Sequence, residues 1–200
     1  MSDSRELLLT AAAEEFAKHG PKGTRVQDIV KAAGVNERMI YHHFGSKEGL
    51  YTAVMKDQRS RLGAAWQPIL EQALTLEPYE GMRLALGGFF ETLLNRPQVA
   101  AMFVHEALGN GPLGLPEGVQ GFPEQLRTLY ERGQAEKVFP AEVPFEVAYG
   151  TAIGALIAMI IFAPRMADFA RAGFAEPGLD TDPVRLREQV VRQLLDGMTG

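Results

Sequence analysis

The chain has 200 residues, a formal net charge of −5 and no cysteine. That length allows one or two domains with a sizeable core. Without cysteine the chain has no disulfide, no thiolate metal ligand and no thiol nucleophile, which fits a cytoplasmic protein. The first nine residues contain Ser, Asp, Arg and Glu instead of a basic region followed by an apolar run, so we expect no signal peptide.

The charge is unevenly distributed along the chain. Up to Arg61 there are ten Lys or Arg and eight Asp or Glu, whereas the remainder has ten and seventeen. A mildly basic N-terminal module on an acidic body is the pattern of a small DNA-reading head on a larger regulatory body. Because the basic excess is small, non-specific DNA binding should be weak and salt-sensitive.

An apolar stripe predicts a first helix that begins at Asp3 or Ser4 and ends at Gly20-Pro21. The stripe consists of Leu7, Leu8, Ala11, Ala12, Phe16 and Ala17. Thr24 is the expected N-cap of a second helix, and Gln27 would complete a capping box. The apolar face of that second helix comprises Val26, Ile29, Val30 and Ala33.

Residues 34–50 predict a tight turn, a very short helix and the start of a long one. Gly34 should end the second helix with a positive φ, and Asn36 should cap the third. Gly45 should end the third helix, and Ser46 should cap the fourth. Ile40 and Phe44 are the expected apolar anchors of the short helix.

A helix, a short turn containing Gly and a second helix form the helix-turn-helix pattern, whose second helix enters the DNA major groove. The alternative is an αα-hairpin that binds nothing. The polar residues of the second helix favour DNA, because their side chains contact phosphates or base edges. These residues are Arg38, Tyr41, His42 and His43.

The same segment resembles the signature of TetR-type transcriptional regulators. Three runs, Gly34-Val35, Ile40 to Phe44 and Ser46 to Leu50, carry the resemblance, which spans Leu8 to Val54. It departs from the signature at Asn36, where Ser is usual, and at Ile40, where Leu is usual. The resemblance implies a homodimer that binds a pseudo-palindromic double-stranded DNA operator and releases it when a small apolar effector binds.

The DNA face is therefore expected to combine phosphate and base contacts. Arg38 and Met39 should reach base edges, and Glu37 could accept from cytosine or only face solvent. The residues expected to contact phosphate are Thr24, Gln27, Tyr41, His43 and Lys47. Asn36 and His42 complete the expected DNA-binding set.

The remaining chain predicts an all-α fold, with a DNA-binding domain at 1–50 and a helical ligand-binding and dimerisation domain at 51–200. A long helix from Lys47 should kink or break at 66–69, where Pro68 removes a hydrogen bond, and resume through Leu70 to Leu76. Further helices are expected at 78–96, 97–109, 123–137 and 145–163, and from Pro183 onward. The Gly- and Pro-rich run 109–123 predicts a loop or gate, and 164–179 an irregular connection.

An effector pocket is expected among the C-terminal helices, where polar groups occur at inward-facing positions. Its predicted lining is Trp66, Met82, Leu86, Phe89, Phe103, Glu106, Tyr130 and Tyr149. Glu106 and the tyrosines would orient a polar end of the effector. The alternative is that these side chains only fill the core.

The run 145–163 is apolar enough to suggest a membrane span, but Glu146, two glycines and the absence of a basic flank favour a helix buried in protein. Gly150, Gly154 and Ala158 recur every four residues, which would let a second helix approach closely. The expected dimer interface comprises Gly150, Gly154, Ala158, Val191, Leu194 and Leu195. Alternatively, the glycines only permit close packing within one chain.

Other functions are less well supported by the sequence. His105-Glu106 and His42-His43 are adjacent pairs, which point in different directions on a helix, so neither forms a catalytic or metal-binding pair. HExxH, GxSxG and phosphate-loop motifs are absent. We therefore expect no enzyme, no cofactor and no metal. An adaptor that has lost DNA binding is disfavoured by the intact Tyr41, His43 and Lys47.

Overall fold

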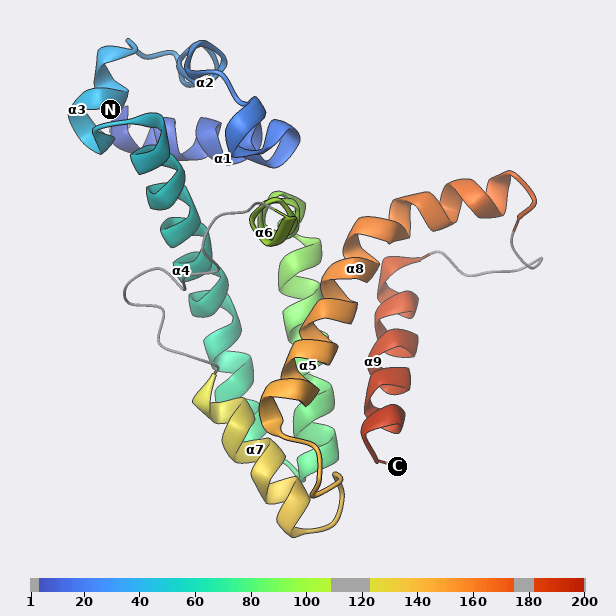
Figure 1. The fold of residues 1–200 in the computed structure, drawn as a ribbon. Coiled ribbons are helices and arrows are strands. Elements are labelled where there is room, and N and C mark those ends of the chain that lie inside the picture. The colour runs from blue at the N-terminus through green and yellow to red at the C-terminus, as the bar shows by residue number, and fades with distance from the viewer. Residues whose placement is uncertain (1–3, 109–122, 175–181, 200) are drawn as a thin grey trace. The chain divides into compact units, whose positions relative to one another are not determined.

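The computed structural model describes residues 4–108, 123–174 and 182–199, and every regular element within those ranges is a helix. The all-α prediction is confirmed (Figure 1). The helices are α1 (Ser4–Gly23), α2 (Val26–Ala33), α3 (Arg38–Phe44), α4 (Lys47–Leu74), α5 (Pro78–Leu94), α6 (Pro97–Leu108), α7 (Glu124–Ala135), α8 (Phe145–Arg171) and α9 (Pro183–Thr199). The predicted loop at 109–123 lies outside the described residues except for Pro123.

The helices form two compact units. The N-terminal unit comprises α1, α2, α3, the part of α4 up to Gly63, and α6; the C-terminal unit comprises the rest of α4 with α5, α7, α8 and α9. The division therefore falls inside α4, whereas the sequence placed it at Leu50. Helix α6 belongs with the N-terminal helices although it follows α5 in the chain.

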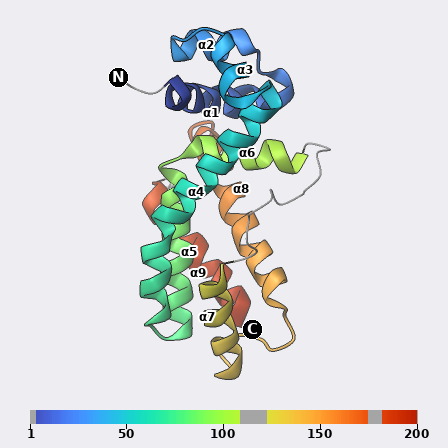
Figure 2. The ribbon, with the colours of Figure 1, turned by 90° about the vertical axis from the view of Figure 1, so that its left-hand side faces the viewer.

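A single apolar cluster holds the N-terminal unit together. Leu8, Phe16, Ile29, Ile40 and Leu50 are fully buried in it, so each of the first four helices contributes at least one side chain. Met102 adds a side chain from α6. Figure 2 shows α1, α2 and α3 gathered in this unit. The burial follows the apolar stripes of the sequence, because a helix buries the face on which its apolar residues recur.

The turns of this unit follow the local sequence. Gly34 has φ 66° and its N–H donates to the carbonyl of Val30, which ends α2 in the left-handed conformation that glycine adopts without steric cost. Gly45 ends α3 with φ 76°. The hydroxyl of Ser46 accepts from the N–H of Gly49 at 3.0 Å and caps α4 as predicted.

The predicted cap of α2 is wrong. The N-cap residue is Arg25, which makes no side-chain capping bond, so Thr24 and Gln27 form no capping box. Thr24 is instead 3% exposed, and its hydroxyl donates to the carbonyls of Glu15 and Gly20. Helix α1 changes direction at Gly20, which has φ 67° and ψ 171°, and the following chain brings Thr24 back against the end of α1.

Of the two outcomes expected near Pro68, a kink or a break of α4, the break is wrong, since the helix continues to Leu74. Proline removes one helical hydrogen bond and normally kinks a helix. Here Pro68 is exposed, while Trp66, Leu70 and Ala73 on the adjoining turns are buried and hold the helix in place. Tertiary packing therefore outweighs the local cost of the proline.

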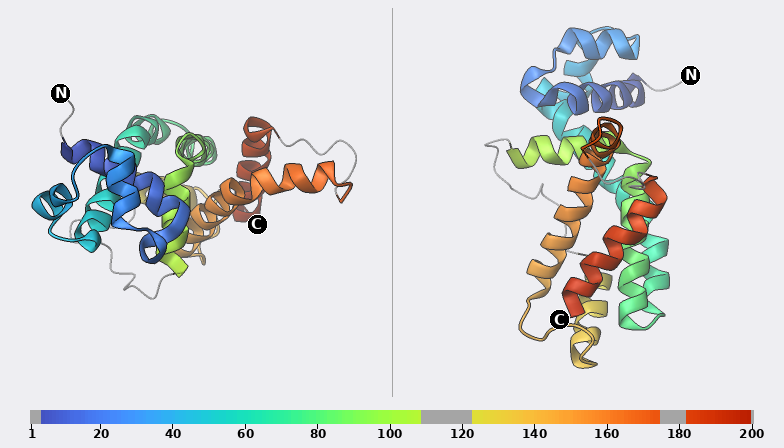
Figure 3. Two further views of the ribbon diagram at one scale, coloured as in Figure 1. Left: turned by 90° about the horizontal axis from the view of Figure 1, so that it is seen from above. Right: turned by 90° about the vertical axis from the view of Figure 1, so that its right-hand side faces the viewer.

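Helix α5 lies at the centre of the C-terminal unit and contacts α7, α8 and α9. Its buried residues include Met82, Leu86, Phe89 and Phe90. The indole N–H of Trp66 donates to the carbonyl of Ala85 at 2.8 Å, which fixes α4 against α5. Figure 3 shows α9 beside α5.

Helix α8 is longer and more exposed than predicted. It continues to Arg171. The prediction of an irregular connection from residue 164 is therefore wrong for residues 164–171. The stretch Phe145–Phe162 has a mean hydropathy of 1.9 and is long enough to cross a membrane, yet 28% of it is buried in the chain. Its exposed large side chains include Val147 and Phe162, at 56% and 54%.

Candidate functional sites

Helix α3 is short and is capped from its N-terminal side. The side-chain oxygen of Asn36 accepts from the N–H of Arg38 at 2.9 Å, as predicted for a capping asparagine. Glu37, between them, already has helical backbone angles. On the inner side of α3, Ile40 is fully buried and Phe44 packs partly buried against the same cluster. The inner side of α3 is thus fixed, which orients its outer side.

The outer side of α3 carries most of the predicted DNA-binding residues. Asn36, Arg38, Tyr41 and His42 are exposed, and 53% of Tyr41 is accessible. The Tyr41 hydroxyl donates to the carboxylate of Glu37 at 3.4 Å, one helical turn away. The structure thus brings these five side chains together on α3 and the two residues directly before it.

The other predicted phosphate contacts differ in their availability. Gln27 is exposed on α2. Lys47 donates to the carbonyl of Thr24 at 3.2 Å, and His43 lies 2.9 Å from the hydroxyl of Ser4. Thr24 has no free donor, because its N–H also bonds the Gly20 carbonyl. Thr24 is therefore a structural residue of the α1–α2 corner and not an exposed phosphate ligand.

Met39 is partly buried against the core cluster of the N-terminal unit. It remains partly exposed, so its contact with base edges stays a prediction. Arg25 is the extended residue directly before α2, and its side chain is exposed. It was not among the residues predicted to contact phosphate. The sequence feature that could have indicated a phosphate contact is a basic residue directly before a helix N-terminus, because phosphates bind at helix N-termini.

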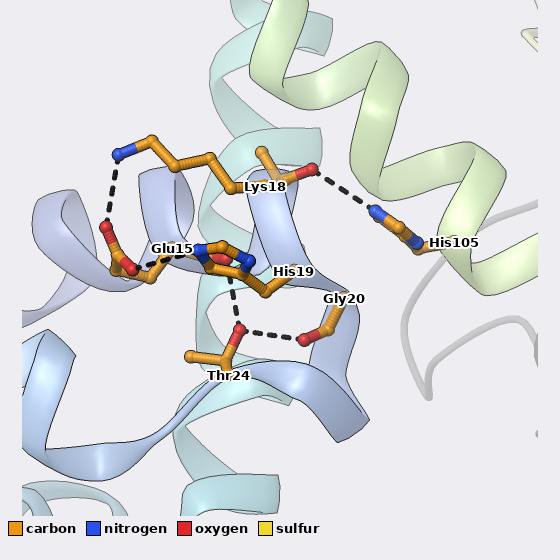
Figure 4. Close-up of polar contacts among 7 residues, drawn as sticks. Glu15, Lys18, His19, Gly20, Thr24 and His105 are labelled. Carbon is orange, nitrogen blue, oxygen red and sulfur yellow. Dashed lines mark hydrogen bonds and ion pairs between the residues drawn. The ribbon is translucent and has the colours of Figure 1, made fainter.

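His105 was considered only as an enzymatic residue, and the structure gives it another place. Its Nε2 atom donates to the carbonyl of Ala17 at 3.2 Å, joining α6 to the end of α1 (Figure 4). The signal in the sequence was Pro21, which has no N–H to donate to the carbonyl four residues earlier.

The predicted effector residues of the C-terminal unit form packed core. Trp66, Met82, Leu86 and Phe89 are each at most 4% exposed, and the Trp66 and Phe89 rings lie 4.7 Å apart. The cavity beside Met82, Leu86 and Tyr130 measures about 10 Å³. Because that is about the space of one water molecule, these residues do not line an open pocket in this structure.

One predicted member of that lining lies elsewhere, and another cannot be placed. Phe103 belongs to the N-terminal unit, where the guanidinium of Arg59 lies 5.6 Å from its ring centre. The side chain of Glu106 lies outside the described residues. The two tyrosines do lie together beside the small cavity. Burial raises the pKa of Tyr149 to about 12, and the Tyr130 hydroxyl donates to the Val143 carbonyl at 3.2 Å.

The predicted dimer residues separate into two groups. Val191 and Leu195 are 3% and 0% exposed within one chain, so a partner cannot reach them and their assignment to an interface is wrong. Gly150 and Gly154 are exposed, and an added Cβ at either position would meet no atom within 4 Å. The alternative that these glycines permit close packing within the chain therefore does not hold for the described residues.

Ala158 and Leu194 line an open groove of about 560 Å³ between α8 and α9. The groove walls contain no Asp, Glu, Lys or Arg. Its polar side chains are Tyr130, Thr151 and Gln193. In the described part of the chain, no three His, Asp or Glu side chains are grouped so that they could hold a metal ion. The groove between α8 and α9 thus offers a mainly apolar surface.

Comparison with known proteins agrees with this arrangement. Residues 8–54 match the family described as bacterial regulatory proteins, tetR family. The HTH-type transcriptional repressor KstR2 of Mycolicibacterium smegmatis is 30% identical over 150 residues, which cover 72% of each chain.

Two solved structures share the fold over nearly the whole chain. The fatty acid degradation regulator FadR from Bacillus halodurans superposes with a TM-score of 0.70 at 21% identity, covering 96% of this chain and 98% of that one. The ketosteroid transcriptional regulator KstR2 of Mycobacterium tuberculosis gives 0.65 at 19% identity, covering 100% and 97%. Together with the identity to the M. smegmatis repressor, these findings show that the chain belongs to the TetR family of bacterial transcriptional regulators.

Proposed function

We propose that the protein is a homodimeric repressor that binds a pseudo-palindromic operator and releases it when a small apolar molecule binds. The observation that carries the proposal is the two-sided character of α3. Its inner residue Ile40 is fully buried, whereas Arg38, Tyr41 and His42 are exposed on the same short helix. A helix that served only for packing would have no reason to expose several groups that bind nucleic acid.

In the complex, Arg38 is the proposed reader of a base edge, because a guanidinium can donate two hydrogen bonds to guanine. Tyr41, His43 and Lys47 are proposed to contact phosphates, together with Gln27 and the exposed N-terminus of α2. His43 and Lys47 are held within the unit by Ser4 and by the Thr24 carbonyl. Those bonds position the two side chains, and phosphate would supply an additional acceptor.

The proposed dimer forms through the exposed side of α8. Val147 and Phe162 are more than half exposed, and Gly150 and Gly154 leave open space between them along the helix. Large exposed apolar surfaces on a soluble chain commonly mark an interface. A second copy of the same helix would bury its own apolar side at the same time, as a twofold interface requires. The groove between α8 and α9 extends this surface.

A membrane is the competing partner for α8, because the stretch Phe145–Phe162 has the length and hydropathy of a span. A span must hide its entire circumference from water. Here α8 carries Glu146, which pairs with Arg127 at 2.7 Å at the start of the helix. Its inner residues Ala152 and Leu156 are already buried within the chain. A second protein copy therefore accounts better for one exposed side.

The proposed effector is apolar. Two structural neighbours are a fatty acid degradation regulator and a ketosteroid transcriptional regulator, and fatty acids and ketosteroids are largely apolar compounds. In this chain, the region around Met82, Leu86, Tyr130 and Tyr149 is apolar and holds two hydroxyl groups. Because the existing cavity is about 10 Å³, binding there must displace side chains. Met198 is suited to move, since it is flexible and lines both this cavity and the neighbouring groove.

The DNA-binding proposal is tested by selecting duplexes from a random library with the purified full-length protein and sequencing those that are retained. We expect an inverted repeat whose half-sites are about 10 base pairs apart, centre to centre, because two heads would contact successive major grooves. Arg38→Ala is the matched variant, and it should change preference at one position of each half-site.

Sedimentation of the same protein without detergent tests the dimer. A mass of twice 21.9 kDa is expected at micromolar concentration. A stable monomer would refute the dimer, and retention in phospholipid vesicles with loss of the soluble form would favour the membrane instead. A library without any enriched sequence would refute specific DNA binding.

A further inference from the structure

The C-terminal end of α1 contains a carbonyl whose usual partner is missing. In an α-helix, the carbonyl of Ala17 would accept from the N–H of residue 21. Residue 21 is proline, which has no N–H, and the chain turns at Gly20 with φ 67° and ψ 171°. The Ala17 carbonyl is therefore left for a donor from another element.

His105 of α6 supplies that donor. Its Nε2 lies 3.2 Å from the Ala17 oxygen, and a carbonyl can only accept, so the imidazole donates (Figure 4). Gly20 makes room for the ring, because an added Cβ would lie 3.1 Å from His105 Nδ1. The corner thus provides both an acceptor and a space fitted to this side chain.

The corner that receives His105 is itself held by hydrogen bonds to α2. The Thr24 hydroxyl donates to the Gly20 carbonyl at 2.7 Å and to the Glu15 carbonyl at 3.0 Å. Lys47 of α4 donates to the carbonyl of Thr24 at 3.2 Å. A displacement at Gly20 would therefore reach the start of α2 and a residue proposed to contact phosphate.

Helix α6 has two further attachments in the N-terminal unit. Met102 is 1% exposed in its core, and Phe103 packs partly buried beneath the guanidinium of Arg59. Only Asn95 and Arg96 separate α6 from the end of α5, which belongs to the other unit. Of these attachments, His105 is the one that contacts the α1–α2 corner.

We propose that His105 is a positioning residue for the DNA-binding surface: its hydrogen bond to Ala17 holds the α1–α2 corner, and through Thr24 and Lys47 the helices that contact DNA. The proposal rests on the proposed DNA-binding function. His105 lies 55 residues beyond Leu50, where the sequence placed the end of the DNA-binding domain. The functional head therefore includes α6.

The test compares His105→Gln with His105→Glu in the full-length protein. The two side chains have the same shape, but Gln keeps an N–H donor at the end of the chain, whereas ionised Glu can only accept. Glu also places a negative charge at the C-terminal end of α1, where the helix dipole disfavours it. Affinity is measured by titration of the duplex recovered in the library selection.

We expect His105→Gln to bind within about threefold of wild type and His105→Glu to bind at least about tenfold more weakly, since a partly buried acceptor loses its donor and meets another acceptor. The matched control is the pair His19→Gln and His19→Glu at the same end of α1, where the side chain is 54% exposed. This pair measures the same change at an exposed position, 3.8 Å from the carboxylate of Glu15, and should differ by less than about twofold to threefold.

Amide hydrogen exchange on the same variants separates positioning from simple stability. His105→Glu should accelerate exchange in α6 and at the α1–α2 corner while α5 and α7 remain as in wild type. Faster exchange with unchanged DNA affinity would overturn the positioning role and leave a structural contact. Equal behaviour of the Gln and Glu variants in both measurements would show that the hydrogen bond has no effect.

A double-mutant cycle covers the case in which His105→Glu does not fold. The Cβ of Gly20→Ala would press on the imidazole, so this change should weaken DNA binding less in a protein that already carries His105→Ala. The backbone strain of alanine at φ 67° is the same in both backgrounds and therefore cancels in the cycle. Strictly additive losses would overturn the proposal. If the wild-type protein enriches no duplex, the proposed DNA-binding function is refuted. A difference in hydrogen exchange between the variants would then show only that His105 stabilises the α1–α2 corner.

Discussion

The two units are specified by different kinds of interaction. In the N-terminal unit, single polar groups and glycines determine the course of the chain: Asn36 and Ser46 accept capping bonds, and Gly34 takes a left-handed turn. In the C-terminal unit, α5, α7 and α8 begin without any side-chain capping bond, and a proline occupies the N-cap or first position of each. Apolar packing around α5 holds that unit together.

This difference has a functional consequence. A surface that reads DNA must hold a few side chains in fixed positions, and directional hydrogen bonds do this at defined residues. A region that accepts an apolar molecule needs volume and adaptable side chains, and many apolar sequences supply these equally well. We therefore expect substitutions at single polar positions to affect the N-terminal unit and changes of size to affect the C-terminal one.

The largest effect should come from size on the outer side of α8. Gly154→Leu fits within one chain, because nothing lies within 4 Å of the added Cβ, but it would obstruct the second copy. A twofold interface contains the residue twice, so association should weaken by about 2–6 kcal/mol. Sedimentation equilibrium measures the loss. Gly63→Leu, at another open and exposed helical glycine, should leave association unchanged.

A smaller effect is expected where polar side chains meet DNA. Arg38→Ala should lose about 1–3 kcal/mol of preference at one base position, because the arginine is proposed to read a base edge. Lys47→Ala should weaken binding to all duplexes alike and reduce the dependence on salt. Titrations with matched and single-mismatch duplexes separate the two outcomes. The same response in both variants would mean that this face of α3 is misassigned.

The buried hydroxyl of Thr24 should contribute to folding. Thr24→Val preserves the shape but removes the donor shared by two carbonyls, which should lower the free energy of unfolding by about 1–2 kcal/mol. Urea unfolding followed by circular dichroism measures this difference. Thr75→Val is the control, since Thr75 makes a comparable bond to Gln72 but is exposed. Equal losses at the two positions would contradict the special role of the α1–α2 corner.

The smallest effect concerns an exposed pair at the start of α8. The hydrogen bond from Arg127 and the N-terminal backbone bond hold the pKa of Glu146 below its ordinary value of 4.5. A carboxyl with a lowered pKa stabilises the folded state above its unfolded pKa, and the contribution disappears as the pH falls through the lowered value. Wild type should therefore exceed Glu146→Gln slightly in stability at pH 6, and the difference should vanish in acid. A difference that grows in acid would contradict this sign.

The sequence was sufficient where a residue acts on its near neighbours. Gly34, Asn36 and Ser46 were assigned correctly because turn and cap chemistry depends on residues within one helical turn. Thr24 was assigned wrongly by the same rules. Its hydroxyl bonds to α1, where the turn at Gly20 leaves carbonyls accessible, and a cap rule considers only the following helix.

The sequence was insufficient to predict features that depend on cavity volume or on packing between residues far apart in the chain. Met82 and Leu86 were correctly expected to face inward, but whether they enclose space depends on how closely neighbouring helices approach. Pro68 was expected to kink or break α4, and the helix runs through it unbroken because Trp66 and Leu70 beside it are buried. Val191 and Leu195 show the apolar spacing of an interface, but packing within the chain already buries them.

The hydrogen bond between Ser4 and His43 has a practical consequence for recombinant forms of the protein. It ties the first residue of α1 to α3, so a peptide fused before Met1 would join the chain three residues from the surface proposed to contact DNA. A fusion after Gly200 would begin beside Met198, at the groove next to α8. An N-terminal tag should therefore disturb operator affinity, and a C-terminal tag the association of subunits.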